Sequence, residues 1–242
     1  MTTAEAEVRR EELASNLHLV RGRIAAACSQ AGRLPGDVSL IVVTKFFPGS
    51  DIQALCGLGV TDIGENRDQE ASAKIGSLPA EVRQRMHVHF IGQLQSNKAH
   101  SLASYADTVH SIDREKLVGA LDRAAAAAGR DLGALVQVRL SGDASAEGRG
   151  GVPPDGVARL ANSVAAAQHL TLRGLMAVAP LGVDPAAAFA ELAELARGVR
   201  ADHPEATWIS AGMSGDLEAG VANGATHLRV GSAILGSRPS SG

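Results

Sequence analysis

Short apolar runs and longer amphipathic segments alternate along the chain. The apolar runs are rich in Val, Ile and Leu and are bounded by Gly or polar residues, a pattern typical of buried strands. It predicts strands at residues 38–44, 60–64, 87–92, 108–112, 135–140, 172–178, 207–211 and 226–230. Between the strands, apolar residues recur with helical spacing. The clearest stripes are Leu13, Leu17, Val20, Ile24 and Cys28, then Leu117 and Leu121, then Phe189, Leu192, Leu195 and Val199.

This alternation of strand and helix predicts a parallel sheet. Eight repeats within 242 residues fit a single α/β domain spanning residues 1–242, a (β/α)8 TIM-type barrel with an extra N-terminal helix. An open, doubly wound sheet is the alternative. We expect flexible tails at 1–10 and 237–242 and a mobile, glycine-rich loop at 141–154. Asp113 and Asp184 are predicted to precede helices that start at Arg114 and Pro185.

Composition and charge narrow the classes of function. The net charge of −3 offers no general attraction to nucleic acid or acidic membranes, and 2% aromatic residues are too few to stack bases. The chain lacks an apolar run of membrane-spanning length and a secretion signal, so we expect no membrane partner and a cytoplasmic location. Cys28 and Cys56 lie in apolar helical segments and are expected to be reduced core thiols.

The chemistry is carried by one amine and two glycine-rich turns. Lys45 follows the apolar run 39–44, and a neutral lysine amine is the nucleophile that captures an aldehyde. Gly212-Met213-Ser214-Gly215 and Arg229-Val230-Gly231-Ser232-Ala233 follow the seventh and eighth predicted strands, where such barrels often bind phosphate. Closing the barrel brings strand one beside strand eight. An amine for an aldehyde next to turns for a phosphate describes a pocket for pyridoxal 5′-phosphate.

Further polar residues surround these segments. Arg229 stays protonated and suits either the pyridine nitrogen of that cofactor or an ion pair at the rim. Asn66 suits either the cofactor ring or the cap of the next helix. His87 and His89 share one face of strand three, but no third ligand supports a metal, and His89 is interpreted as a polar residue lining the mouth.

The chain resembles the family of pyridoxal phosphate homeostasis proteins, also known as proline synthase co-transcribed homologues. The resemblance runs from about residue 10 to residue 238, and residues 89–98 are its most specific part. The other segments that carry it are 43–45, 63–66, 109–113, 174–177, 212–214 and 229–236. The chain departs from the common family pattern at Arg67, Val88 and Gly215.

The resemblance implies a single barrel like the N-terminal domain of alanine racemase. It implies that Lys45 holds pyridoxal phosphate as an internal aldimine, a Schiff base. It also implies that Ser214, Gly231 and Ser232 contact the phosphate and Arg229 the pyridine nitrogen. We expect the cofactor pocket to include Asn66, His89 and Met213 as well. Members of the family lack robust catalysis and are thought to carry or buffer the cofactor.

Three functions follow from these residues. The first is a monomeric carrier that regulates the cofactor and hands it to enzymes that depend on it. The second is a weak amino-acid racemase with Lys45 as one base. The only tyrosine, Tyr105, lies before strand four, where nothing places it as a second base. The third is a phosphosugar enzyme or Schiff-base aldolase, for which Glu65 is the available acid or base.

Overall fold

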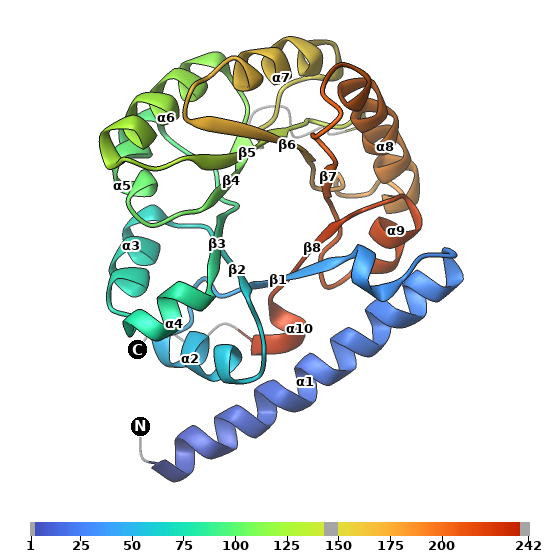
Figure 1. Ribbon diagram of the computed structural model, residues 1–242. Helices are drawn as coiled ribbons and strands as arrows, with labels where there is room; N and C mark the ends of the chain where they lie inside the picture. The colour runs from blue at the N-terminus through green and yellow to red at the C-terminus, as the bar shows by residue number, and fades with distance from the viewer. Residues whose placement is uncertain (1–2, 143–149, 238–242) are drawn as a thin grey trace.

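The computed structural model describes residues 3–142 and 150–237. Within them, parallel strands form a closed barrel in the order β1 to β8, with β1 paired to both β2 and β8 (Figure 1). The predicted barrel is therefore confirmed, and the open sheet is wrong. The strands are β1 Ser39–Val43, β2 Asp62–Glu65, β3 His87–Phe90, β4 Thr108–Ile112, β5 Leu132–Gln137, β6 Leu170–Met176, β7 Trp208–Ser210 and β8 His227–Val230.

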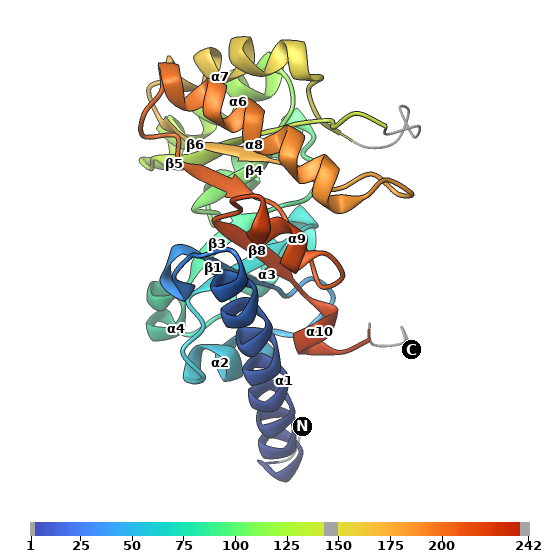
Figure 2. The ribbon, with the colours of Figure 1, turned by 90° about the vertical axis from the view of Figure 1, so that its right-hand side faces the viewer.

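Helices surround the barrel on the outside (Figures 1 and 2). The α-helices are α1 Thr3–Gln30, α2 Gly49–Gly57, α3 Asp68–Gly76, α4 Ala80–Arg85, α5 Ala99–Ala103, α6 Glu115–Ala128, α7 Val157–Ala165, α8 Pro185–Asp202, α9 Leu217–Ala222 and α10 Ser232–Leu235. Short 3₁₀ turns lie at Pro35–Asp37, Ser96–Lys98 and Pro154–Gly156.

The long leading helix α1 lies outside the ring and packs on α2, α9 and α10 (Figure 1). Its predicted apolar stripe is buried, and Cys28 and Cys56 are free, buried thiols. Residues 3–10, where the sequence predicts a tail, are the first turns of this helix. Arg9 holds them in place, because its guanidinium donates to Asp51 at 2.8 Å and to the carbonyl of Leu235 at 2.9 Å.

One of the two predicted helix starts is confirmed. The side chain of Asp184 accepts a hydrogen bond from the backbone N–H of Ala186 at 3.1 Å, with Pro185 opening α8. The cap at Asp113 is wrong, because α6 begins at Glu115 and the Asp113 carboxylate pairs with the guanidinium of Arg114 instead. Half of the glycine-rich loop, residues 143–149, lies outside the described residues.

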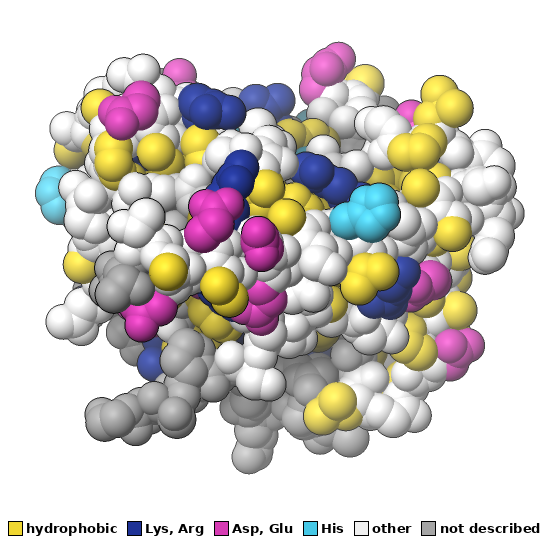
Figure 3. Space-filling view, turned by 90° about the horizontal axis from the view of Figure 1, so that it is seen from below, with side chains coloured by type: hydrophobic (Ala, Val, Ile, Leu, Met, Phe, Trp, Pro, Cys, Tyr) yellow, Lys and Arg dark blue, Asp and Glu magenta, His cyan; other side chains and the backbone are white. Residues whose placement is uncertain are grey.

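On the side of the molecule that carries α1, acidic and basic side chains lie next to each other among scattered hydrophobic groups (Figure 3). This face therefore carries no broad area of a single charge. None of the helices described is both long enough and apolar enough to cross a bilayer.

Candidate functional site

Lys45 lies in the turn after β1, at the end of the barrel where the strands finish. It is half-buried, and within the described part of the chain its Nζ makes no hydrogen bond or ion pair. Its contact is with the ring of Phe46, whose centroid lies 5.7 Å away. Phe46 has a φ of 71°, the one positive value among the described non-glycine residues. Such a backbone conformation costs a bulky residue about 1–3 kcal/mol, so the turn must be held by its surroundings.

Buried ionic groups hold this turn on both sides of Lys45. The ammonium of Lys74 donates to the carbonyl of Thr44 at 2.9 Å and to the carboxylates of Glu65 at 2.9 Å and Glu70 at 3.0 Å. Glu70 in turn accepts the backbone N–H of Phe46 at 2.6 Å, and Glu65 accepts the hydroxyl of Thr44 at 2.7 Å. The three N–H groups of Lys74 are thus all engaged, and Lys45 carries the amine that is available for chemistry.

The carboxylate of Glu65 belongs to this structural cluster. Burial raises its pKa, and the neighbouring Lys74 opposes that effect. Its Oε1 is bound by Thr44 and Lys74, while Oε2 has no hydrogen-bond partner among the described residues. Glu65 is therefore committed to shaping the Lys45 turn, which weakens its case as the mobile acid or base that an aldolase needs.

The two glycine-rich turns meet at the same end of the barrel. The hydroxyls of Ser214, after β7, and Ser232, after β8, lie 3.4 Å apart. Gly212 has a φ of 91°, which glycine adopts without strain, and Arg23 fixes the turn by donating to the carbonyl of Ser214 at 3.1 Å. Ser232 opens α10, whose first backbone N–H groups have no intrahelical partner. Hydroxyls and free N–H groups together suit a phosphate.

Gly231 brings these turns against the lysine strand. A Cβ on Gly231 would lie 3.2 Å from the carbonyl oxygen of Val43 and 3.3 Å from its Cβ, so any larger residue would have to push the neighbouring strand away slightly. Val43 is two residues before Lys45. The predicted neighbourhood of Lys45 and the phosphate turns is therefore confirmed as a neighbourhood of backbones.

Arg229 lies inside the barrel, with its guanidinium reaching the ends of β6 and β7. It donates to the hydroxyl of Ser210 at 2.6 Å and to the carbonyl of Ala177 at 2.8 Å. Burial lowers the pKa of Arg229 to about 10, and the nearby Asp216 works in the opposite direction. The guanidinium remains charged at neutral pH. Neither of its two partners in the described part of the chain is a carboxylate, so the rim ion pair weighed as its alternative role is not formed there.

The remaining predicted residues behave differently from one another. Asn66 does not cap α3, which begins after Arg67 without a side-chain cap, and it packs on Gly92. Met213 is 38% exposed, and its backbone N–H is taken by Asp216 at 2.5 Å. His89 does not line the mouth, because it is fully buried and both ring nitrogens bind side chains inside the barrel.

Tyr105 is unsuited to act as a second base. Its side chain is buried, and its hydroxyl lies 3.3 Å from a carboxylate oxygen of Asp68. Burial, together with Asp68, raises the pKa of Tyr105 far above its ordinary value. Sequence reasoning gave no role to Lys74, Glu70, His110 or Ser210. The spacing of Glu70 and Lys74, four apart on one helix, signals an ion pair but not its contact with the lysine turn.

The fold and site define a barrel of the alanine racemase type. Residues 21–239 match the family described as alanine racemase, N-terminal domain. The pyridoxal phosphate homeostasis protein of Mycobacterium tuberculosis is 44% identical over 243 residues, which cover 95% of this chain and 94% of the relative. That of Escherichia coli is 35% identical over 234 residues, 94% of this chain and 97% of the relative.

A solved structure of a related protein has a similar fold. PipY of Synechococcus elongatus, with PLP bound, is 34% identical with a TM-score of 0.78, covering 93% of this chain and 100% of PipY. The chain belongs to the family of pyridoxal phosphate homeostasis proteins.

Proposed function

We propose that the protein binds pyridoxal 5′-phosphate at this mouth and carries or buffers it, so that it regulates the level of the free cofactor. The observation that carries the proposal is that Gly231 packs against the strand leading to Lys45, while its neighbour Ser232 pairs its hydroxyl with that of Ser214. Among the described residues the amine of Lys45 makes no hydrogen bond or ion pair that would occupy it. The names of the relatives and the bound PLP of PipY support it.

The residues present fit this group. The amine of Lys45 suits its aldehyde, and Ser214, Gly231 and Ser232 offer hydroxyls and backbone N–H groups to its phosphate. Arg229 retains three of its five N–H donors and would face the ring nitrogen. Asn66 would hold the ring edge. Because Met213 presents only its side chain and His89 is enclosed, neither would contact the cofactor through a hydrogen bond.

In this proposal Lys45 holds the aldehyde reversibly. Its neutral amine adds to the aldehyde carbon, the C=O bond is replaced by C=N, and one water leaves. Water or another amine reverses the step and releases the cofactor. The Lys74 cluster keeps the turn fixed throughout, so the amine is oriented without its own hydrogen bonds.

Weak rather than efficient catalysis follows from the same residues. When bound, pyridoxal phosphate supplies an electron sink for carbanions, and a cationic partner at its ring nitrogen makes that sink poorer. Tyr105 is bound to Asp68 and buried, so it offers no second base. A weak racemase remains the second candidate. Exchange of an amino acid's α-hydrogen for solvent deuterium, abolished by Lys45→Ala, would support it.

Titration with pyridoxal phosphate, followed by visible absorbance, tests the binding. We expect the wild type to develop a stoichiometric band that Lys45→Ala abolishes without unfolding the barrel. Lys116→Ala, an exposed lysine on α6, is the matched control and should keep the band. A Lys45→Ala protein that still forms the band would remove Lys45 from the proposal.

As a carrier, the protein would act as a monomer in the cytoplasm and deliver the cofactor to apo-enzymes that depend on it. Delivery predicts that the loaded protein activates such an apo-enzyme faster than the cofactor leaves into a trap of free amine. If activation is no faster than release into the trap, the protein buffers the cofactor but does not deliver it.

A further inference from the structure

A continuous chain of hydrogen bonds crosses the barrel interior and ends at Arg229. The carboxylate of Asp62 lies 3.0 Å from Nε2 of His89, whose Nδ1 lies 2.8 Å from Nε2 of His110. Nδ1 of His110 lies 2.9 Å from the hydroxyl of Ser210, which accepts from Arg229 at 2.6 Å. Four of these five side chains are buried, and Asp62 is 26% exposed.

The chemistry of the partners fixes the direction of every bond. Arg229 can only donate, so the hydroxyl of Ser210 accepts from it and uses its own hydrogen elsewhere. Its one other hydrogen-bond partner among the described residues is Nδ1 of His110, which must therefore be unprotonated. A neutral His110 then carries its proton on Nε2 and donates to Nδ1 of His89.

The last bond follows in the same way. With Nδ1 accepting, His89 carries its proton on Nε2 and donates it to the carboxylate of Asp62. The chain thus runs from a guanidinium at one end to a carboxylate at the other, with each donor facing an acceptor. The reverse direction would leave the buried hydrogen of Ser210 without an acceptor, at a cost of about 1–3 kcal/mol.

The surroundings favour a neutral imidazole at His110. Burial lowers the pKa of His110 well below its ordinary value, and the neighbouring His89 and Arg229 add to this effect. The ring centroids of His87 and His227 lie 4.5 Å and 6.2 Å from that of His89. A positive charge on His89 would therefore lie close to two further imidazoles. The hydrogen bond from His89 keeps the pKa of Asp62 low despite partial burial.

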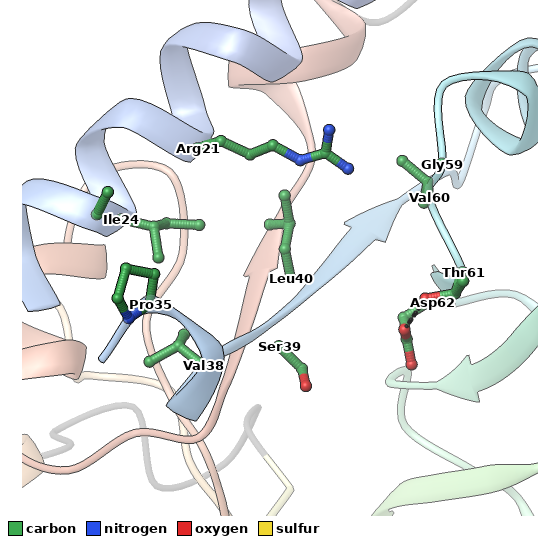
Figure 4. A pocket seen from close by; sticks show the side chains of 11 residues that line it. Arg21, Ile24, Pro35, Val38, Ser39, Leu40, Gly59, Val60, Thr61 and Asp62 are labelled. Atoms are coloured by element: carbon green, nitrogen blue, oxygen red, sulfur yellow. Dashed lines mark hydrogen bonds between the residues drawn. The ribbon is translucent and has the colours of Figure 1, made fainter. Parts of the chain in front are cut away.

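We propose that Asp62, His89, His110 and Ser210 are positioning residues that fix the guanidinium of Arg229 for the ring nitrogen of the cofactor. The inference rests on the proposed function, because that function assigns Arg229 to the ring. Asp62 orients this chain of hydrogen bonds from the end of the barrel where the strands begin, opposite the Lys45 mouth. It lines a cavity of about 480 Å³ between α1 and β1 (Figure 4) and a second one, also of about 480 Å³, that includes His87 and Trp208.

The first test needs no cofactor. Nitrogen-15 NMR of histidine-labelled apo-protein at pH 7 should find His89 and His110 neutral, each with its proton on Nε2. Asp62→Asn can offer His89 either an acceptor or a donor, and we expect the single tautomer to be lost. A proton on Nδ1 of His110, or a charged His89, in the wild type would overturn the chain's direction.

The second test measures the affinity and the absorption spectrum of the bound cofactor. Ser210→Ala removes the acceptor of Arg229, and the loss of one charge-assisted hydrogen bond predicts about tenfold weaker pyridoxal phosphate binding. Asp62→Asn should shift the visible absorption maximum of the bound cofactor. Asp131→Asn is the control, because Asp131 lines the second of these cavities together with Asp62 and, among the described residues, its exposed carboxylate bonds to the half-buried His169.

The outcomes separate the two proposals. If the wild type forms no band with pyridoxal phosphate, the proposed function fails, and the NMR tautomers still decide the direction of the chain. If the wild type binds but Ser210→Ala and Asp62→Asn match Asp131→Asn in affinity and spectrum, the positioning role is wrong and the function stands. Thermal melts of each variant exclude a simple loss of fold.

Discussion

Two lysines near the mouth have opposite roles because of what their amines contact. Lys74 is engaged by three oxygens and is 7% exposed at its side chain, so it is a structural cation. The amine of Lys45 contacts only the face of Phe46 within the described residues. Their sequence contexts differ too, since Lys45 follows an apolar strand and Lys74 lies on a helix. The first context was enough to predict Lys45 as the reactive residue.

The two serines of the phosphate turns give a prediction at the same scale. Ser214→Ala and Ser232→Ala should each weaken pyridoxal phosphate binding by up to about tenfold, since each removes one hydroxyl donor. Pyridoxal without its phosphate is the control ligand, and its affinity should not change. Equal losses for both ligands in a titration would mean that the serines do not face the phosphate.

At the scale of elements, the turn between β1 and α2 owes its shape to α3. The ammonium and carboxylate that hold it, Lys74 and Glu70, project from that helix onto Thr44 and Phe46. This arrangement keeps a left-handed phenylalanine, which the isolated segment would not maintain. It could not be predicted from sequence, because it depends on how α3 packs against the strand ends.

Lys74→Met tests this support. Removing the cation leaves the buried Glu65 and the partly exposed Glu70 without their ion-pair partner, and we expect a loss of about 3–5 kcal/mol in the free energy of unfolding. Capture of the aldehyde should slow as the Lys45 turn relaxes. Urea denaturation and the rate of band formation measure the two effects.

The double variant Lys74→Met with Glu65→Gln separates charge from geometry. It removes one of the unpaired charges and should recover part of the stability, while aldehyde capture stays slow. Full recovery of both would show that Lys74 does not position Lys45.

For the whole molecule, the alternation of strand and helix predicted the closed barrel, and most strands lie within a few residues of their predicted bounds. Lys45 and the two serine turns were predicted because barrel closure makes them neighbours regardless of detail. The hydrogen-bond chain through His89 and His110 was not predicted. Their pairing depends on side chains that meet across the interior, and strand periodicity indicates only that His89 faces inward.

The buried histidines predict how the stability of the molecule depends on pH. Burial lowers the pKa of His110 and of His227, the latter to about 3. Below pH ~6.5 the unfolded chain binds a proton on each and the folded protein does not. Stability therefore falls on acidification, by about 1.4 kcal/mol per pH unit for each histidine. The raised pKa of Glu65 acts with the opposite sign.

Matched variants isolate the histidine contribution. His227→Gln should reduce the slope of unfolding free energy between pH 6 and pH 4 by about 1.4 kcal/mol per pH unit. His18→Gln, on the exposed face of α1, is the matched control for removing one imidazole. Equal slopes for His227→Gln and the wild type would show that His227 is protonated in the folded state.

Borohydride reduction tests most directly whether Lys45 holds pyridoxal phosphate. Reduction of the loaded protein should bleach its visible band and fix one cofactor irreversibly, and peptide mapping should locate the added mass on Lys45. An unmodified Lys45 after reduction, or the label on Lys74 or on surface lysines, would show that Lys45 does not hold the cofactor.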